Sequence, residues 1–241
     1  MINLAIALVG ALLSALLLGI WLSPLEAVLP ALVVGGLLYW FIARRTGKRI
    51  EAIMLAAQAE LMNMSKAQNP AVAERHLEKA VSIMERARSY GRWQFFVDKL
   101  INSQIGSLHF IQQDFKKAQP LLENSDPRQW IPRVMLATLH YRAKDYQKMD
   151  AVFEDAARYN KKQGLLYTTW AWCHWKQDNN DRAIQILSRG DKELEGKDER
   201  LKQNLLNLQN DKKMKMKGYG TDWYQFMLEK PQELRQQVRY R

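Results

Sequence analysis

Three stretches of the chain align with one another at offsets of 31 and 34 residues: GSLHFIQQDFKKAQPLLENS (residues 106–125), ATLHYRAKDYQKMDAVFEDA (residues 137–156) and AWCHWKQDNNDRAIQILSRG (residues 171–190). Each stretch keeps small, polar and bulky apolar residues in the same order. The aligned sets are Gly106, Ala137 and Ala171; Asp114, Asp145 and Asn179; Ala118, Met149 and Ala183; Leu122, Phe153 and Leu187; Ser125, Ala156 and Gly190. A repeat of this length predicts helix pairs that stack and share one core.

The middle of each stretch predicts a turn between two helices. The turn sequences are QQDFKKA, AKDYQKM and QDNNDRA, and their Asp or Asn is suited to cap the second helix. This pattern resembles the tetratricopeptide repeat, whose period is about 34 residues. The resemblance implies an all-α fold, with a solenoid of three to four helix pairs over residues 69–210. It departs from the family at Met149, where a small residue is usual, and at Trp130, where proline is usual.

The expected helices of this region follow from the repeat. The three better copies run from about 99 to 123, 130 to 158 and 164 to 189, and a helix at about 199–210 closes the row. A degenerate leading repeat is expected at about 73–88, because terminal repeats of solenoids are commonly atypical.

The first 43 residues predict a transmembrane helical hairpin. They contain one charged side chain, Glu26, and two apolar runs, at about 4–22 and 27–43, flank it. Each run is close to the roughly 20 residues that cross a hydrocarbon core. A cleavable signal peptide is disfavoured, because no Lys or Arg precedes the first run and a second run follows it. A single span, with the other segment in the interface, stays open as an alternative.

The basic flank after the second run predicts the orientation. Arg44, Arg45, Lys48 and Arg49 lie there, at the start of a basic juxtamembrane and connecting helix expected over residues 44–68. By the positive-inside rule, the C-terminal domain of this multi-pass protein faces the cytoplasm, which fits a bacterial inner membrane. The four cations either set topology alone or also contact anionic lipid, at about 1 kcal/mol each.

Outside the first 43 residues, 36 Lys and Arg stand against 24 Asp and Glu, a net charge of +12. This charge favours acidic proteins, anionic lipid or nucleic acid as partners. Nucleic acid is disfavoured, because no recognised nucleic-acid module is present. The one cysteine, Cys173, excludes an intramolecular disulfide and fits a reducing compartment.

The sequence predicts no enzyme, no cofactor and no metal site. Nucleotide-binding, metalloprotease, hydrolase and paired CxxC motifs are absent. His109, His140 and His174 share one register, so we expect them in a row rather than around one ion. Cys173 and His174 are neighbours on a helix and diverge by about 100°. We expect this cysteine to be a small buried hydrophobe.

The tetratricopeptide resemblance also implies where a protein partner binds. In that family the first helix of each pair lines a concave groove, and its exposed positions map here to Ser107, Phe110, Ile111, Thr138, Tyr141, Arg142, Trp172, Trp175 and Lys176. We expect Phe110, Tyr141, Arg142, Trp172, Trp175 and Lys176 to bind an apolar segment that bears acidic residues. The alternative is that some of these rings pack under the long N-terminal helix. The family's two-carboxylate clamp is disfavoured, because Ser103 and Ser107 occupy its positions.

Residues 211–241 form a basic, aromatic tail. It alternates Lys with Met214 and Met216, and an aromatic cluster follows from Tyr219 to Leu228. This tail either packs back on the repeats or is a docking element of its own. The function expected is a membrane-anchored cytoplasmic scaffold or adaptor. The alternative is an accessory subunit of a larger transport or envelope-assembly complex, with the hairpin packed against other spans through Gly10, Ala11, Ser14, Gly19, Gly35 and Gly36.

Overall fold

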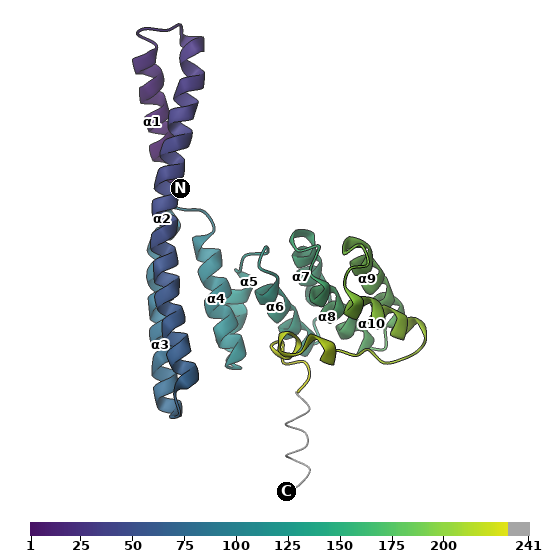
Figure 1. Ribbon diagram of the computed structural model, residues 1–241. Helices are drawn as coiled ribbons and strands as arrows, with labels where there is room; N and C mark the ends of the chain where they lie inside the picture. The colour runs from purple at the N-terminus through teal and green to yellow at the C-terminus, as the bar shows by residue number, and fades with distance from the viewer. Residues whose placement is uncertain (231–241) are drawn as a thin grey trace. The chain divides into compact units, whose positions relative to one another are not determined.

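The computed structural model describes residues 1–230, and within that range it holds eleven α-helices, two short 3-10 helices and no β-strand (Figure 1). The predicted all-α class is therefore confirmed. The chain divides into two compact units, Met1–Ile101 and the residues from Asn102 onward, and the division falls inside α4 (Val97–Ile111). The predicted tail is described as far as residue 230, and its remainder lies outside the described residues.

The first unit begins with two apolar helices that run antiparallel, α1 (Ile2–Leu18) and α2 (Pro24–Lys66). Small residues bring their backbones close together. A Cβ added at Gly35 would lie 2.8 Å from the Cβ of Ala11, and one added at Gly10 would overlap the side chain of Leu38. A larger residue at Gly35, which faces the backbone of α1, would force the two helices apart, whereas at Gly10 only the end of the Leu38 side chain must move.

One helix, α2, is long and apolar enough by its length and composition to cross a membrane. Only 17% of its most apolar window is buried within the protein, whereas a helix in the core of a soluble protein is mostly buried. The α1 helix is apolar but shorter, at 17 residues. A second span therefore stays a prediction. The α2 helix also continues through Gly47 without a break, so its apolar half and the half that follows Gly47 form one helix.

The second half of α2 pairs with α3 (Pro70–Arg86), which is followed by the 3-10 helix η1 (Ala87–Arg92). The α3 helix buries Leu77, Ala80 and Met84, and Glu60 of α2 accepts hydrogen bonds from His76 and Lys79 at 2.8 and 2.6 Å. The segment expected as a leading repeat thus has α2 as its partner. The boundary predicted at residue 69 lies inside the first unit, because the apolar stripe of α3 is covered by α2.

The second unit is a row of helices in which consecutive members pack together. After α4 come α5 (Phe115–Glu123), α6 (Trp130–Arg142), α7 (Tyr146–Tyr159), α8 (Gly164–Trp175), α9 (Asn180–Glu193) and α10 (Glu199–Gln209). The α6 helix packs on α7, α8 packs on α9, and α10 packs on both α8 and α9. These bounds match the helices expected from the repeat to within a few residues. Leu122, Phe153 and Leu187, the bulky repeat positions, are fully buried.

Three turns of this unit have the same conformation. In each, one residue has a positive φ, and the next residue caps the following helix through its side chain, as the sequence predicted. The positive-φ residues are Gln113, Lys144 and Asp178, with φ of 65, 59 and 58°. The caps Asp114, Asp145 and Asn179 accept from the backbone N–H of Lys117, Lys148 and Arg182 at 3.3, 3.1 and 3.3 Å. Their own N–H groups donate to the carbonyls of His109, His140 and His174 at 2.9, 2.9 and 3.1 Å.

The chain after α10 packs back on the second unit rather than leaving it. This C-terminal segment, residues 212–228, contains the 3-10 helix η2 (Lys217–Tyr219) and the single turn α11 (Thr221–Tyr224). It buries five large side chains, which are Met214, Met216, Tyr219, Trp223 and Phe226. The tail was expected either to pack on the repeats or to be a docking element of its own, and its described residues pack on the repeats.

Candidate partner-binding face

The first helices of the pairs, α6 and α8, present adjoining aromatic rings. The ring of Tyr141 lies 6.0 Å from that of Trp172 and 6.1 Å from that of Tyr146, measured between centroids. Burial raises the pKa of Tyr141 to about 12, so its hydroxyl stays protonated at neutral pH. The sequence therefore brings together the aromatic residues that the repeat register placed on one face of α6 and α8.

The C-terminal segment covers part of this face. The indole of Trp223 packs edge-on against Trp172 at 5.2 Å, and Phe226 packs in the same manner against Trp130 at 6.1 Å. The guanidinium of Arg142 donates to the carbonyl of Met227 at 2.6 Å. These contacts attach the segment to both α6 and α8.

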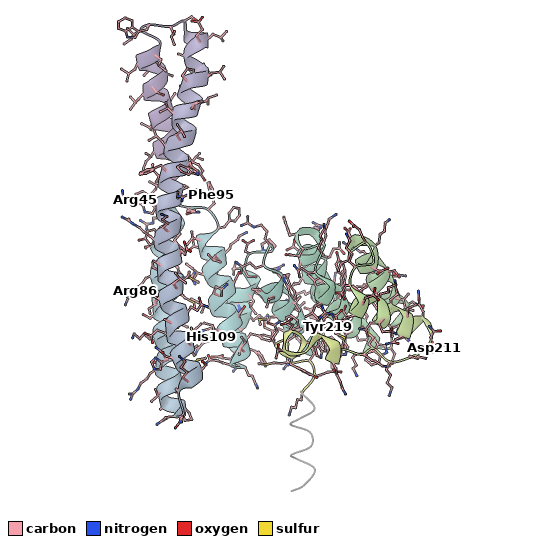
Figure 2. All side chains as sticks on the ribbon, viewed as in Figure 1. Arg45, Arg86, Phe95, His109, Asp211 and Tyr219 are labelled. Carbon is pink, nitrogen blue, oxygen red and sulfur yellow. The ribbon has the colours of Figure 1, made fainter. Side chains whose placement is uncertain are left out.

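Tyr219 attaches the segment to α8 where the two meet (Figure 2). Its hydroxyl lies 2.9 Å from that of Thr168, which itself donates to the carbonyl of Gly164 at 2.9 Å. Burial raises the pKa of Tyr219 well above its usual range, so this hydrogen bond joins two neutral groups. The guanidinium of Arg200 lies 4.4 Å from the Tyr219 ring centroid and covers it from α10.

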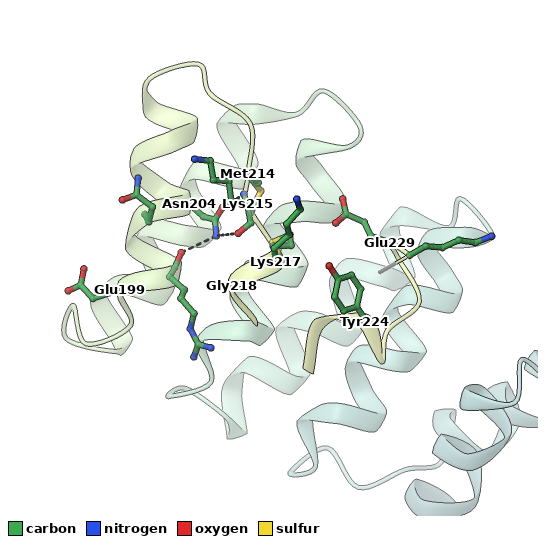
Figure 3. Close-up of a pocket in the computed structure, with 12 residues that line it drawn as sticks. Glu199, Asn204, Met214, Lys215, Lys217, Gly218, Tyr224 and Glu229 are labelled. Atoms are coloured by element: carbon green, nitrogen blue, oxygen red, sulfur yellow. Dashed lines mark hydrogen bonds between the residues drawn. The ribbon is translucent and has the colours of Figure 1, made fainter. Parts of the chain in front are cut away.

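An asparagine of α10 holds the start of the segment through the backbone (Figure 3). The backbone N–H of Lys215 donates to the Asn204 side chain at 2.6 Å, and the Asn204 amide donates to the carbonyl of Lys215 at 3.2 Å. Around Lys215, Met214 and Met216 are buried while Lys217 is exposed. The lysine and methionine alternation thus marks an extended segment with one face inward. Its period of two was the available sequence signal.

Two residues expected to contact a partner are buried, and that part of the prediction is wrong. Phe110 is 0% exposed and packs 5.5 Å from Phe115, between ring centroids, so it belongs to the core. Trp172 is 4% exposed, because Trp223 covers it. Thr138, at an equivalent position, is fully buried as well.

Four expected residues keep exposed surface, and we call them the rim: Arg142 and Lys176 are exposed, and Tyr141 and Trp175 are half-buried. The ammonium of Lys176 lies 4.6 Å from the Trp175 ring centroid, within range of a cation–π interaction. The rim lies at the C-terminal ends of α6 and α8, where the helix dipole also favours cations. It combines apolar and positive character in one place.

The described residues hold no group of three or more His, Cys, Asp or Glu side chains arranged to bind a metal ion. Burial raises the pKa of the Cys173 thiol well above its usual range, so the thiol is protonated at neutral pH. The three histidines expected in one row lie at equivalent positions of α4, α6 and α8. Burial lowers the pKa of both His109 and His140.

A polar cluster that the sequence did not reveal joins α7 to α8. Asp150 accepts hydrogen bonds from the indole of Trp170 at 2.6 Å and pairs with the Nε2 of His174 at 2.8 Å. Burial acts to raise the pKa of Asp150, but the hydrogen bonds from His174 and Trp170 outweigh burial and lower it. Because Asp150 precedes its partners by 20 and 24 residues, no local motif marks the cluster.

A cleft of about 640 Å³ lies between α10 and the C-terminal segment. Met214, Met216 and Tyr224 line it together with charges of both signs (Figure 3). The charged lining residues are Arg200, Lys215, Lys217 and Lys230, with Glu199 and Glu229. Because two carboxylates lie among the four cations, the lining selects no single class of ligand.

The membrane-surface residues expected from the sequence, Arg44, Arg45, Lys48 and Arg49, are all exposed on α2. The guanidinium of Arg44 lies 5.3 Å from the Trp40 ring centroid, one turn earlier on the helix.

Comparisons with protein-family models, curated proteins and solved structures find no match.

Proposed function

We propose that this protein is a membrane-anchored scaffold or adaptor of the tetratricopeptide-repeat type. In this proposal α1 and α2 form a hairpin in a bacterial inner membrane, and the second unit is a solenoid in the cytoplasm. A protein partner that carries acidic and apolar residues binds the rim, with no catalysis and no cofactor. Anchoring raises the effective concentration of the adaptor for partners at the same membrane, so modest affinity suffices.

The three equivalent turns support the repeat assignment. Each combines a positive-φ residue, a side-chain cap and a hydrogen bond back to the histidine of the preceding helix. Small residues also allow the paired helices to approach closely. A Cβ at Gly106 would lie 3.0 Å from the Leu122 side chain, which is tighter than an ordinary contact.

The apolar surface of the first unit supports the anchor. Leucine, isoleucine and valine side chains of α1 and α2 are largely exposed, which is unfavourable in water and favourable in lipid. The four cations that follow support a cytoplasmic second unit through the positive-inside rule.

The observation that carries the adaptor proposal is the rim, which keeps exposed surface beside the C-terminal segment although Arg142 donates to the carbonyl of Met227. The inner part of the face is filled by five large buried side chains of that segment, each contributing about 1.5–3 kcal/mol of burial energy. A micromolar partner gains only about 8 kcal/mol in total. Displacing the segment would therefore consume most or all of the binding energy, so the partner binds beside it.

Photo-crosslinking in intact membranes tests this proposal. A photoreactive amino acid replaces Trp175 at the rim, and the control carries it at Lys161, which is exposed in the turn before α8. A discrete adduct from position 175 and none from position 161 is the expected result. If neither position gave an adduct, the rim would be overturned as a binding surface.

The alternative of an accessory subunit, whose hairpin packs against other spans, receives less support. Two of the glycines that suggested it, Gly10 and Gly35, are used within the α1 and α2 pair. Gly36 has no heavy atom within 4 Å of an added Cβ, and a single open glycine defines no docking surface. Nucleic-acid binding also loses the aromatic part of its signal, because Tyr219, Trp223 and Phe226 beside the exposed lysines are buried.

A further inference from the structure

Within the first unit, a cleft of about 350 Å³ lies between α1, α2 and η1. One part of its lining is apolar and contains Ile6, Phe41 and Ile42. Another part is polar and cationic and contains Arg45, Thr46 and Arg49. From Phe41 to Arg49 the rise of the helix is about 12 Å, at about 1.5 Å per residue. The lining thus changes from hydrocarbon to cation over a length comparable to a bilayer interface.

The two arginines of the cleft are available to an anion. Among residues 1–230, neither Arg45 nor Arg49 forms an ion pair with a carboxylate. Both guanidinium groups lie on exposed residues of α2, four positions and hence about one turn apart. An arginine binds phosphate oxygens through paired N–H donors, so two of them on one helix face suit a phosphodiester.

Aromatic residues surround the same cleft on the η1 side. Tyr90 and Trp93 line it, and Trp93, Phe95 and Phe96 are 38, 42 and 53% exposed. Figure 2 shows Phe95 at about the same height along α2 as Arg45. Exposed rings beside basic residues are the composition of a membrane interface, where Trp and Tyr are enriched.

The start of α1 is joined to the end of η1, which borders the same cleft. The backbone nitrogen of Met1 donates to the carbonyl of Arg92 at 2.7 Å, which ties the beginning of α1 to the end of η1. The α1 helix, the basic part of α2 and the aromatic residues after η1 are thereby held at one level of the first unit. A site built from all three elements exists only when they are packed together.

We propose that this cleft binds one anionic phospholipid, with the headgroup phosphate between Arg45 and Arg49 and the upper part of an acyl chain against Ile6, Phe41 and Ile42. The proposal rests on the membrane anchor proposed above, and it adds a specific lipid to a general anchor. Trp93 and Tyr90 border the headgroup. The basic flank of α2 then holds a lipid as well as setting topology.

Native mass spectrometry of the full-length protein in detergent tests the site. The protein is titrated with phosphatidylglycerol, phosphatidylcholine or inorganic phosphate. We expect one phosphatidylglycerol to be retained in preference to phosphatidylcholine. In the Arg45→Gln, Arg49→Gln variant this binding should weaken by about thirtyfold, the equivalent of about 1 kcal/mol for each of two cations. A Trp93→Ala variant should weaken it less.

The control carries the same charge change elsewhere in the first unit, as Arg75→Gln with Arg86→Gln, at two exposed positions of α3. This control should bind phosphatidylglycerol like the wild type. Equal retention of both lipids, or equal binding by the Arg45, Arg49 variant and the wild type, would overturn the lipid site. Competition by inorganic phosphate as strong as that by phosphatidylglycerol would overturn the acyl-chain contact and assign the cleft to a free anion.

Carbonate washing of membranes separates this proposal from the anchor. The wild type and both double variants should stay in the membrane, because the apolar surface of α1 and α2 is unchanged. Retention without lipid selectivity would leave the anchor standing and overturn the lipid site. Release of the wild type by carbonate would overturn the anchor, and the lipid site with it.

Discussion

The indole rings of Trp172 and Trp223 pack edge to face with their centroids 5.2 Å apart, and both rings are buried. The repeat register places Trp172 on the face expected to receive a partner, and the protein's own C-terminal segment supplies the ring that covers it. The segment is therefore part of the folded domain. This relationship determines which of the expected contact residues stay at the surface.

Replacing Trp223 by Ala should destabilise the second unit by about 3–5 kcal/mol, the usual cost of truncating a buried aromatic residue. Denaturant unfolding of the full chain in detergent, followed by near-ultraviolet circular dichroism, measures this change. Limited proteolysis should also cut the segment after α10 sooner than in the wild type. The control, Lys213→Ala, alters an exposed residue of the same segment and should behave like the wild type. Unchanged stability of Trp223→Ala would contradict the packing described.

Asp150→Asn should cost about 1–3 kcal/mol of stability, because the hydrogen bonds from His174 and Trp170 lose a charged acceptor. The control is Asp211→Asn, at an exposed position whose positive φ of 54° asparagine tolerates. The two variants make the same chemical change, so a difference between their unfolding midpoints isolates the cluster. Equal midpoints would show that Asp150 contributes nothing.

The same cluster gives a pH dependence. The folded protein lowers the pKa of Asp150 below its ordinary value of 3.8, so its contribution is present above that value. Stability from this carboxylate should fall as the pH drops below about 3.8 and through the lowered pKa, because the unfolded state takes up a proton before the folded state does. Unfolding midpoints measured from pH 6 down to about pH 2.5 should fall more steeply in the wild type than in Asp150→Asn. Parallel curves would count against the hydrogen bonds that Asp150 accepts from Trp170 and His174.

The repeated turns give two opposite predictions at neighbouring residues. Asp145→Ala removes the cap of α7 and should cost about 1 kcal/mol. Lys144→Gly relieves a side chain held at a φ of 59° and should gain up to about 1 kcal/mol. Lys148→Ala is the control, because it removes a surface ion pair with Asp145 and leaves the cap hydrogen bond in place. A loss in Lys144→Gly would mean that the turn is not strained at this residue.

Local signals predicted the helices of the second unit well. The turn residues Asp114, Asp145 and Asn179 and the small positions beside them act within one helix pair, so their spacing is enough to define the elements. The same reasoning applies to Cys173, whose complete burial follows from the apolar residues around it.

Contacts between segments far apart in the chain could not be predicted from the sequence. The segment of α3 was expected as a leading repeat without a stated partner, because an apolar stripe such as the one around Ala80 does not specify its partner, and the structure shows that α2 covers it. Likewise Trp172 has the pattern of an exposed ring, and only the return of Trp223, 51 residues later, buries it. The rim is what remains of the expected site once Phe110 and Trp172 are found to be buried.

The rim should bind a partner independently of the buried rings. One variant that alters the rim and one that removes a buried ring separate these two contributions. Trp175→Ala with Lys176→Glu removes an apolar surface and reverses a charge. The adduct formed from a photoreactive residue at Tyr146, whose ring lies 6.1 Å from that of Tyr141, should fall by about 5- to 30-fold, the effect of losing 1–2 kcal/mol at a binding hot spot. The unfolding midpoint should fall by much less than in a variant that empties a buried aromatic site, because Lys176 is exposed and Trp175 is only half-buried.

Trp172→Ala makes the opposite comparison, because it empties a buried site and should lower the unfolding midpoint by an amount that corresponds to about 3–5 kcal/mol. It keeps all four rim side chains, although Tyr141 loses a ring contact, so the adduct from position 146 should persist under conditions in which the variant is folded. A rim variant that keeps the full adduct yield would place the partner elsewhere. A partner lost only in Trp172→Ala would instead mean that the covered face binds it, after the segment around Trp223 has moved away.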